Sequence, residues 1–180
     1  MCLIKGNHEL FAQMYLESRL EAKQWKLWGG VGTIREIEAL TDFQLKELHG
    51  FLRDLEHYKI IDFSKYKKAV LTHSGLHADY IMGLADGEID IVRSIERAVQ
   101  EDEFDYLISN DLHYVPARLI DRINMFVIVG HVPVMSINDD NSYKIVHKKK
   151  YMCMDTGSGY RKDGGKISMY RIDDNTEYYI

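Results

Sequence analysis

An α/β fold is what the sequence predicts, and three observations support it. Short apolar runs at 69–72 and 125–129 have the length and composition of buried strands. Other segments place their apolar residues at helical spacing. The chain has 180 residues, of which 46% are hydrophobic and 28% charged, an ordinary composition for one globular domain. We therefore expect residues 1–180 to form a single domain.

Charge and composition exclude several classes of partner. The chain has 28 acidic and 23 basic residues, so its net charge of -5 gives no broad positive field and nucleic acid is not an expected partner. The basic run at 148–150 reads as a solvated hairpin tip. No apolar run approaches the ~20 residues of a membrane span. Two cysteines without metal or redox spacing indicate a reducing, cytoplasmic location.

The first predicted elements lead to a histidine. Residues 2–4 read as the end of a strand, Gly6 and Asn7 as a turn, and residues 9–24 as a helix with one apolar side. His8 would then lie between a strand and a helix. Such junctions gather ligands in α/β sheets, and a helix N-terminus favours anions. The position suits chemistry on a phosphate.

A glycine-rich loop and a second helix follow. Residues 25–32 contain two tryptophans, which we interpret as packing residues, and three glycines that end the first helix. Thr41 and Gln44 have the spacing of a capping box, and apolar residues recur at helical spacing from Leu45 to Leu55. We expect an amphipathic helix there.

Two predicted strands each end beside a histidine and a glycine. The run at 69–72 leads into His73, with Ser74 and Gly75 after it. The run at 125–129 leads into Gly130 and His131. Between them we expect a helix over 89–99, a solvated acidic stretch at 101–105 and an irregular or helical segment to residue 122. A turn at 138–141 should precede three short strands at 143–146, 151–154 and 167–172.

Three strand-end side chains form a candidate metal site. Asn7, His73 and His131 supply one amide oxygen and two imidazole nitrogens, which suit divalent Mn, Fe, Zn or Co. A hydrolytic centre with two cations needs more ligands than these. The further carboxylates would have to come from elsewhere, and the region before Cys2 is the obvious place.

Four motifs in order carry a family resemblance. They are Gly6-Asn7-His8-Glu9, Leu71-Thr72-His73-Ser74-Gly75-Leu76, Gly130-His131-Val132-Pro133 and Asp155-Thr156-Gly157. Together they resemble the bacterial serine/threonine phosphoprotein phosphatase branch of the calcineurin-like metallophosphoesterases. Segments 28–33 and 164–167 are similar to further parts of those proteins, so the resemblance spans about residues 3–173.

The resemblance implies a fold, a reaction and residue roles. The fold would be a β-sandwich flanked by helices (α-β-β-α), and the activity hydrolysis of a phosphorylated protein or small phosphoester by a metal-bound hydroxide. Asn7, His73 and His131 would bind the second of two metal ions, with Mn favoured. His8 would be the general acid, a role that its unperturbed pKa near 6.5 suits. Glu9 would support the loop and helix.

The departures from the family matter as much. The two motifs that hold the first metal and the bridging carboxylate have no counterpart, so we expect at most one metal ion here and a chain truncated at its N-terminus by roughly 60 residues, or two strand-helix units. Ser74 and Val132 differ from the usual residues without removing a ligand. Arg118 is a weak candidate for contacting the substrate phosphate.

Other interpretations stay open. Symmetrical diadenosine tetraphosphate hydrolases share these motifs, and a non-catalytic remnant that binds one metal ion fits the missing ligands. His73 and His77 have the spacing of a helical zinc pair, although Ser74 and Gly75 disfavour a helix. Asp155 fits a turn better than catalysis. We interpret the two remaining histidines of this half, at 113 and 147, as packing or surface residues.

Overall fold

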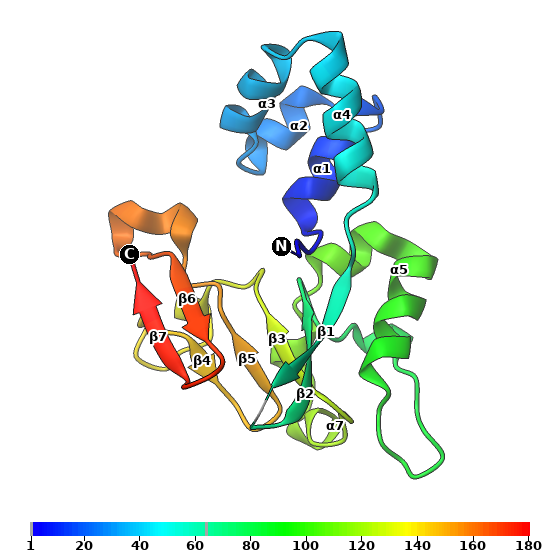
Figure 1. Ribbon diagram of the computed structural model, residues 1–180, viewed down its shortest axis with the longest axis vertical. Helices are drawn as coiled ribbons and strands as arrows, with labels where there is room; N and C mark the ends of the chain where they lie inside the picture. The colour runs from blue at the N-terminus through cyan, green and yellow to red at the C-terminus, as the bar shows by residue number, and fades with distance from the viewer. Residues whose placement is uncertain (1, 64) are drawn as a thin grey trace. The chain divides into compact units, whose positions relative to one another are not determined.

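The computed structural model describes residues 2–63 and 65–180, which form a mixed α/β fold. The chain divides into two compact units, Met1–Glu56 and His57–Ile180. We call the first the helical unit and the second the sheet unit (Figure 1). That both belong to a single domain stays a prediction.

The helical unit contains four helices: α1 (Asn7–Leu16), α2 (Ala22–Leu27), α3 (Val31–Glu38) and α4 (Asp42–Arg53). The prediction of one helix over 9–24 is wrong, because the chain leaves the helix after Leu16. Ser18 has a φ of 58° and Glu21 is extended, so a turn separates α1 from α2. The apolar residues keep helical spacing on both sides of this turn, so the sequence pattern did not indicate it.

The capping box predicted at the start of α4 is confirmed. The Gln44 backbone N–H donates to the Thr41 hydroxyl oxygen at 3.4 Å, and the Thr41 N–H donates to the Gln44 side-chain oxygen at 3.0 Å. Trp25 has 0% exposure and packs inside this unit, as interpreted. The other buried apolar side chains of the unit include Leu10, Phe11, Ile34, Ile37 and Leu52.

The sheet unit is built on a five-stranded sheet in the order β1-β2-β3-β5-β4. The strands are β1 (Tyr58–Phe63), β2 (Lys67–Thr72), β3 (Phe126–Val129), β4 (Val146–His147) and β5 (Tyr151–Cys153). The three central strands, β2, β3 and β5, run parallel, and β1 and β4 are antiparallel edges. The predicted strands at 69–72, 125–129 and 151–154 are thus present within a residue or two. β1 was not predicted.

A two-stranded hairpin covers one face of this sheet. It consists of β6 (Ser168–Arg171) and β7 (Thr176–Tyr179). Tyr170 and Tyr179 pack against a buried cluster from the five-stranded sheet that comprises Phe63, Ala69, Phe126, Ile128, Ile145 and Met152. Part of the core therefore lies between two sheet layers, one of five strands and one of two.

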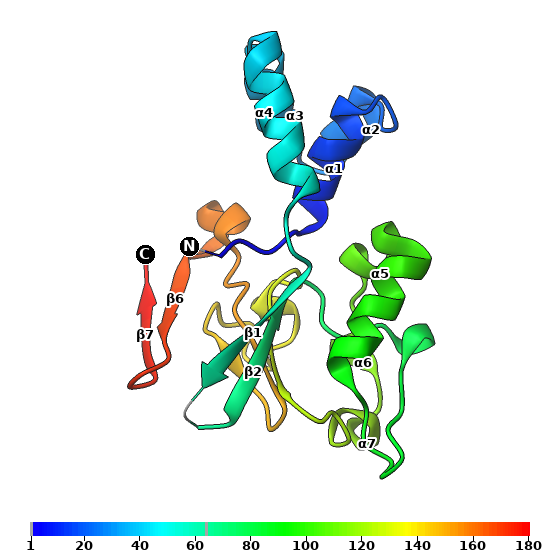
Figure 2. The ribbon, with the colours of Figure 1, turned by 45° about the vertical axis from the view of Figure 1, so that its right-hand side comes forward.

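The remaining elements of the sheet unit are helices: η1 (Ala78–Tyr80), α5 (Ile91–Ile108), α6 (Asp111–Tyr114), α7 (Ala117–Ile120), η2 (Val134–Ser136) and η3 (Ser158–Asp163). α5 (Figure 2) extends nine residues beyond the predicted helix end at 99 and includes the acidic stretch. The backbone of α5 is non-helical at Asp102, which makes a local kink. No helix within residues 2–63 and 65–180 has the length and apolarity that crossing a membrane requires.

Candidate metal site

The two strand-end histidines of the sheet unit lie together. Because β2 and β3 are parallel and paired in register, His73 and His131 emerge at the same edge of the sheet. The Gly130 N–H donates to the His73 carbonyl at 3.1 Å, which continues the ladder past both strand ends. His73 Nε2 lies 3.1 Å from His131 Nδ1. These two imidazoles are thus within contact distance, and their role as metal ligands stays a prediction.

His131 has a strained backbone. Its φ is 65°, and the Val132 N–H donates to the Gly130 carbonyl at 2.8 Å across it, which makes a three-residue turn. A non-glycine residue in this left-handed region costs about 1–2 kcal/mol. Such strain clusters at functional sites. Here it aims the imidazole at His73.

A backbone carbonyl determines which nitrogen of His131 faces the pair. His131 Nε2 lies 3.1 Å from the Ile108 carbonyl oxygen, which can only accept a hydrogen bond. In the neutral ring Nε2 therefore carries the proton, and Nδ1 presents its lone pair to His73. This arrangement, with one ring nitrogen held by a carbonyl and the other directed inward, is the usual one for a metal-ligating histidine.

The last turn of α5 supports both histidines. The Ser74 hydroxyl donates to the Leu107 carbonyl at 3.0 Å, next to the Ile108 carbonyl that holds His131. The Tyr106 and Thr72 hydroxyl oxygens are 2.5 Å apart. Burial raises the pKa of the Tyr106 hydroxyl, so this group stays a neutral donor. Residues on each side of His73 are thus attached to one rigid helix end.

The spacing of the two nitrogens fits a shared cation. Two nitrogens at about 2.0–2.1 Å from one Zn²⁺ would lie about 2.8–3.0 Å apart at a right angle and about 3.3–3.4 Å apart at the tetrahedral angle. The observed 3.1 Å between His73 and His131 lies between these values. Without a cation, the same distance suits a hydrogen bond from His73 Nε2–H to His131 Nδ1. Neutral imidazole nitrogens suit transition metals.

A third imidazole, that of His113 in α6, lies in the neighbourhood of this pair. Burial, followed by the proximity of His131, lowers the pKa of His113 to about 4. Its ring packs edge-on against Tyr151, with centroids 5.4 Å apart. The buried His113 Nδ1 has no hydrogen-bond partner among the described residues. His113 is therefore a neutral packing residue, as interpreted from the sequence.

His77 does not join His73 in a zinc site. Residues 73–77 are not helical, and Gly75 has a φ of 84°. His77 Nε2 instead lies 2.8 Å from the Asp105 carboxylate, and its Nδ1 accepts the Asp79 N–H at 3.2 Å. Within residues 2–63 and 65–180, no group of three or more His, Cys, Asp and Glu side chains could hold a metal ion. The pair contributes two nitrogens, and the third predicted donor is an amide.

That amide donor, Asn7, and the predicted acid His8 are the first two residues of α1 in the helical unit. Glu9 has the predicted supporting role, because its carboxylate accepts the Gly6 N–H at 3.0 Å. The His8 side chain is exposed and its ring contacts Phe11 edge-on, with centroids 5.6 Å apart. The ligand role of Asn7 and the acid role of His8 stay predictions.

Two motifs of the family resemblance meet inside the helical unit. A Cβ atom at Gly29 would lie 3.7 Å from His8 Cε1, so the segment that begins at Trp28 runs beside His8. Thr33, from the same segment, and His8 line a cavity of about 320 Å³ together with Glu9 and Glu36. The exposed His8 imidazole thus borders a space formed by residues of its own unit.

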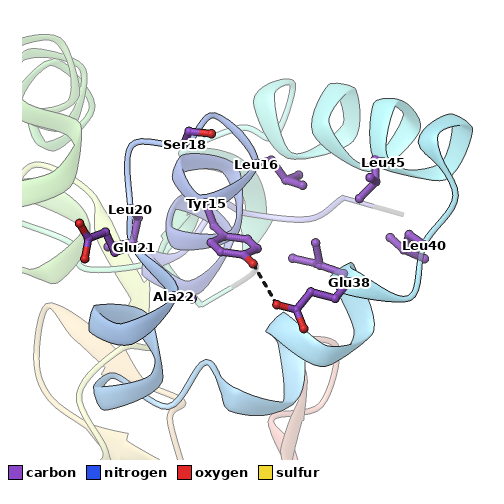
Figure 3. Close-up of a pocket in the computed structure, with 10 residues that line it drawn as sticks. Tyr15, Leu16, Ser18, Leu20, Glu21, Ala22, Glu38, Leu40 and Leu45 are labelled. Carbon is purple, nitrogen blue, oxygen red and sulfur yellow. Dashed lines mark hydrogen bonds between the residues drawn. The ribbon is translucent and has the colours of Figure 1, made fainter.

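A larger hollow of about 570 Å³ in the helical unit is a different feature (Figure 3). Within it the Tyr15 hydroxyl donates to the Glu38 carboxylate at 3.3 Å. Burial and the nearby carboxylate raise the pKa of Tyr15. The residues that line this hollow include no lysine, arginine or histidine, so it offers no cationic side chain to a phosphate.

The structure does not bring Arg118 to the histidine pair. Arg118 is exposed on α7, and Asp121 at the end of α7 forms an ion pair with Lys149, two residues before β5 starts. Figures 1 and 2 likewise show α7 beside the beginning of the parallel strands, whereas the histidines follow their ends. The phosphate-contact role of Arg118 stays a prediction without support from its position.

Asp155 occupies the predicted turn. Its carboxylate accepts the Gly157 N–H at 3.0 Å, so its side chain serves the local backbone. The residues that sequence reasoning missed are Tyr106, Leu107 and Ile108, the support of the pair. Their signal was an apolar run directly after the acidic stretch, in helical register with Ile91, Ile95 and Ala98.

Comparisons with known proteins add no family assignment. No protein-family model matches the chain, and a search of curated proteins gives no match. The resemblance to metallophosphoesterases therefore rests on the motifs of this chain.

Proposed function

We propose that this chain is part of a metal-dependent phosphoester hydrolase, and that His73 and His131 are ligands of its catalytic metal ion. One observation carries the proposal: two imidazole nitrogens 3.1 Å apart at the ends of adjacent parallel strands. The strain at His131 and the carbonyl behind its Nε2 support it. The order of the four motifs connects this pair to phosphoester chemistry.

The residues of the chain have separate tasks in this reaction. His73 Nε2 and His131 Nδ1 would hold the metal ion, and the end of α5 keeps the His131 ring oriented through the Ile108 carbonyl. A divalent cation there supplies stabilisation of negative charge on the phosphoryl oxygens. In the liganded state the His73 ring would carry its one proton on Nδ1, which leaves Nε2 free to bind, and protonation of either imidazole to its cationic form would compete with the metal, so affinity should fall as pH falls.

His8 is proposed to protonate the leaving oxygen from its ring N–H. Its exposed imidazole can exchange protons with solvent between turnovers, and the start of α1 favours a negatively charged group nearby. Asn7 is proposed as the amide ligand of the same metal ion. The substrate class is a phosphorylated protein or a small phosphoester, and the cellular location is proposed to be cytoplasmic.

The proposed fold is the helix-flanked β-sandwich of the calcineurin-like metallophosphoesterases. The β6–β7 hairpin supports it, because its tyrosines pack on the face of the five-stranded sheet. Parallel central strands that end in histidines support it further.

Metal titration by calorimetry tests the site without relying on activity. MnCl₂ and ZnCl₂ should bind the wild-type chain, and His73→Ala and His131→Gly should each weaken binding by more than about tenfold. Glycine is chosen at 131 because it adopts the positive φ without strain. His147→Ala is the matched control, since that imidazole is exposed and bonded to Glu177 at 2.6 Å. Unchanged affinity in both pair variants would exclude the pair as a metal site.

Turnover distinguishes an enzyme from a metal-binding module. With Mn²⁺, hydrolysis of p-nitrophenyl phosphate should fall about 10²–10⁴-fold in His8→Ala while metal affinity is retained. A phosphopeptide and diadenosine tetraphosphate, assayed side by side, then separate the two substrate classes. Tight metal binding with no turnover of any of the three compounds would refute the hydrolase and leave the non-catalytic alternative.

A further inference from the structure

Six lysines gather at the edge of the sheet opposite the histidine pair. Lys65, Lys67 and Lys68 lie in and after the β1–β2 turn, and Lys148, Lys149 and Lys150 form the turn between β4 and β5. Figure 1 shows both turns at the same end of the sheet unit, and Figure 2 shows them there again. We call these residues the lysine cluster. From the sequence, the run at 148–150 was interpreted as a solvated hairpin tip, and the lysines at 65–68 were not identified as part of a cluster.

Half of the cluster already has partners. Lys149 forms an ion pair with Asp121 at 2.9 Å, and Lys150 Nζ donates to the Ile123 carbonyl at 2.6 Å. Lys65 Nζ lies over the Tyr66 ring, 5.2 Å from its centroid. For Lys67, Lys68 and Lys148, no side-chain hydrogen bond or ion pair occurs within residues 2–63 and 65–180. Lys68 is opposite Asp62 in the β1–β2 ladder. Three ammonium groups are thus available to an anion.

The lysines border a cleft of about 450 Å³ with an apolar floor. Lys67, Lys68, Lys149 and Lys150 line it, together with Tyr66, Asn124, Met125 and Phe126. A cleft of this size accommodates a few side chains or a small ligand. Lys67 is held in the left-handed region with a φ of 63°, so the turn carries backbone strain beside the cleft. The cleft combines positive rims with apolar contact area.

We propose that this lysine-rimmed cleft docks an acidic peptide segment of a partner protein that contains an apolar residue. Charge complementarity selects the occupant: in a chain with a net charge of -5, four lysines line this one cleft, and Lys65 and Lys148 lie in the two turns beside it. The apolar floor receives the apolar side chain, and carboxylates meet the three available ammonium groups. This inference concerns a different edge of the sheet and does not depend on the hydrolase proposal.

The aromatic groups of the cleft disfavour single-stranded nucleic acid. Tyr66 stacks face to face on Phe126, with centroids 3.8 Å apart and an interplanar angle of 6°. Because one face of Tyr66 is filled in this way, the ammonium of Lys65 must lie over the other. Neither face of Tyr66 can then stack on a base, which is the contact that aromatic side chains contribute to single-strand binding. A peptide needs no such platform.

Fluorescence anisotropy tests the docking. The probe is a fluorescein-labelled peptide with two glutamates on each side of a central leucine, and the same peptide with glutamines is its neutral counterpart. The wild-type chain should bind the glutamate peptide at least about tenfold more tightly at low salt, with the difference reduced by added salt. The double variant Lys67→Glu/Lys148→Glu should lose at least about tenfold in affinity.

A matched control changes net charge equally elsewhere. Lys23→Glu/Lys26→Glu alters two exposed lysines of α2 in the helical unit and should bind the probe within about twofold of wild type. Urea unfolding confirms that both double variants are folded. Equal losses in the two variants, no preference for glutamate over glutamine, or tighter binding of an oligothymidine than of the acidic peptide would each overturn the proposal.

Discussion

The neutral, partly buried imidazole of His113 should make this protein sensitive to mild acid. Its pKa is lowered to about 4 by burial and by the proximity of His131, whereas a histidine in the unfolded chain titrates near 6.5. The unfolded state therefore binds a proton between these two pH values and the folded state does not. The contribution of His113 to stability is complete above pH 6.5 and is lost as the pH falls through about 4.

The size of the effect follows from the two pKa values. The difference between the two pKa values sets the largest loss in the free energy of unfolding, about 3 kcal/mol, since one pKa unit corresponds to about 1.4 kcal/mol. At pH 5 the loss relative to pH 7.5 is about 2 kcal/mol, because the folded state is still almost unprotonated. The imidazole is partly buried and its Nδ1 has no hydrogen-bond partner among the described residues, and both features favour the neutral ring.

Urea unfolding at pH 7.5 and pH 5 measures this term. The His113→Leu and His113→Gln variants cannot titrate at this position, so both should lose about 2 kcal/mol less than wild type on acidification. The two variants together control for packing, because leucine removes the unsatisfied nitrogen, whereas glutamine keeps a polar group at this position. If wild type and both variants lose the same free energy between the two pH values, His113 is not the group responsible.

Two further predictions concern particular packing positions. Gly75→Ala should destabilise the chain by about 2–4 kcal/mol in urea unfolding, because Gly75 has a φ of 84° and an added Cβ would lie 2.7 Å from Leu112 Cδ2. The control is Gly50→Ala in α4, where an added Cβ meets no atom within 4 Å, and it should stabilise the chain by about 1 kcal/mol. Equal effects of the two substitutions would contradict the reasoning. Cys153 is fully buried, and burial raises the pKa of its thiol to about 12. A thiol reagent at pH 8 should therefore modify the exposed Cys2 in the native protein and Cys153 only after denaturation. Rapid labelling of both cysteines in the native protein would disprove the burial of Cys153.

Much of the fold was predictable because its determinants are local. The runs that became β2, β3 and β5 are short and apolar, and parallel strands that end in histidines bring those histidines to one edge. Thr41 and Gln44 specified the start of α4 through two hydrogen bonds between near neighbours. Asp155 specified its turn in the same way.

The parts that were missed depend on contacts distant in sequence. β1 has no alternating pattern over Tyr58–Phe63, because two isoleucines are adjacent between its charged residues, and it is a strand because β2 pairs with it. β7 likewise depends on β6 and on the sheet beneath. The end of α5 looked like a solvated acidic segment, yet Tyr106 and Leu107 are fully buried and hold the turn after β2. The spacing of residues within the end of α5 does not indicate that Thr72 and Ser74 are its partners.

The strain at His131 links the energetics of the pair to its proposed use. Its positive φ costs about 1–2 kcal/mol, and its ring makes two hydrogen bonds, to His73 and to the Ile108 carbonyl, worth about 1 kcal/mol each. The two contributions nearly cancel, so the geometry adds little to the stability of the chain by itself. The proposed metal ion would add a favourable contribution to this balance. Binding of a cation to both nitrogens would do so, which is why His131→Gly should lose metal affinity while its stability changes little.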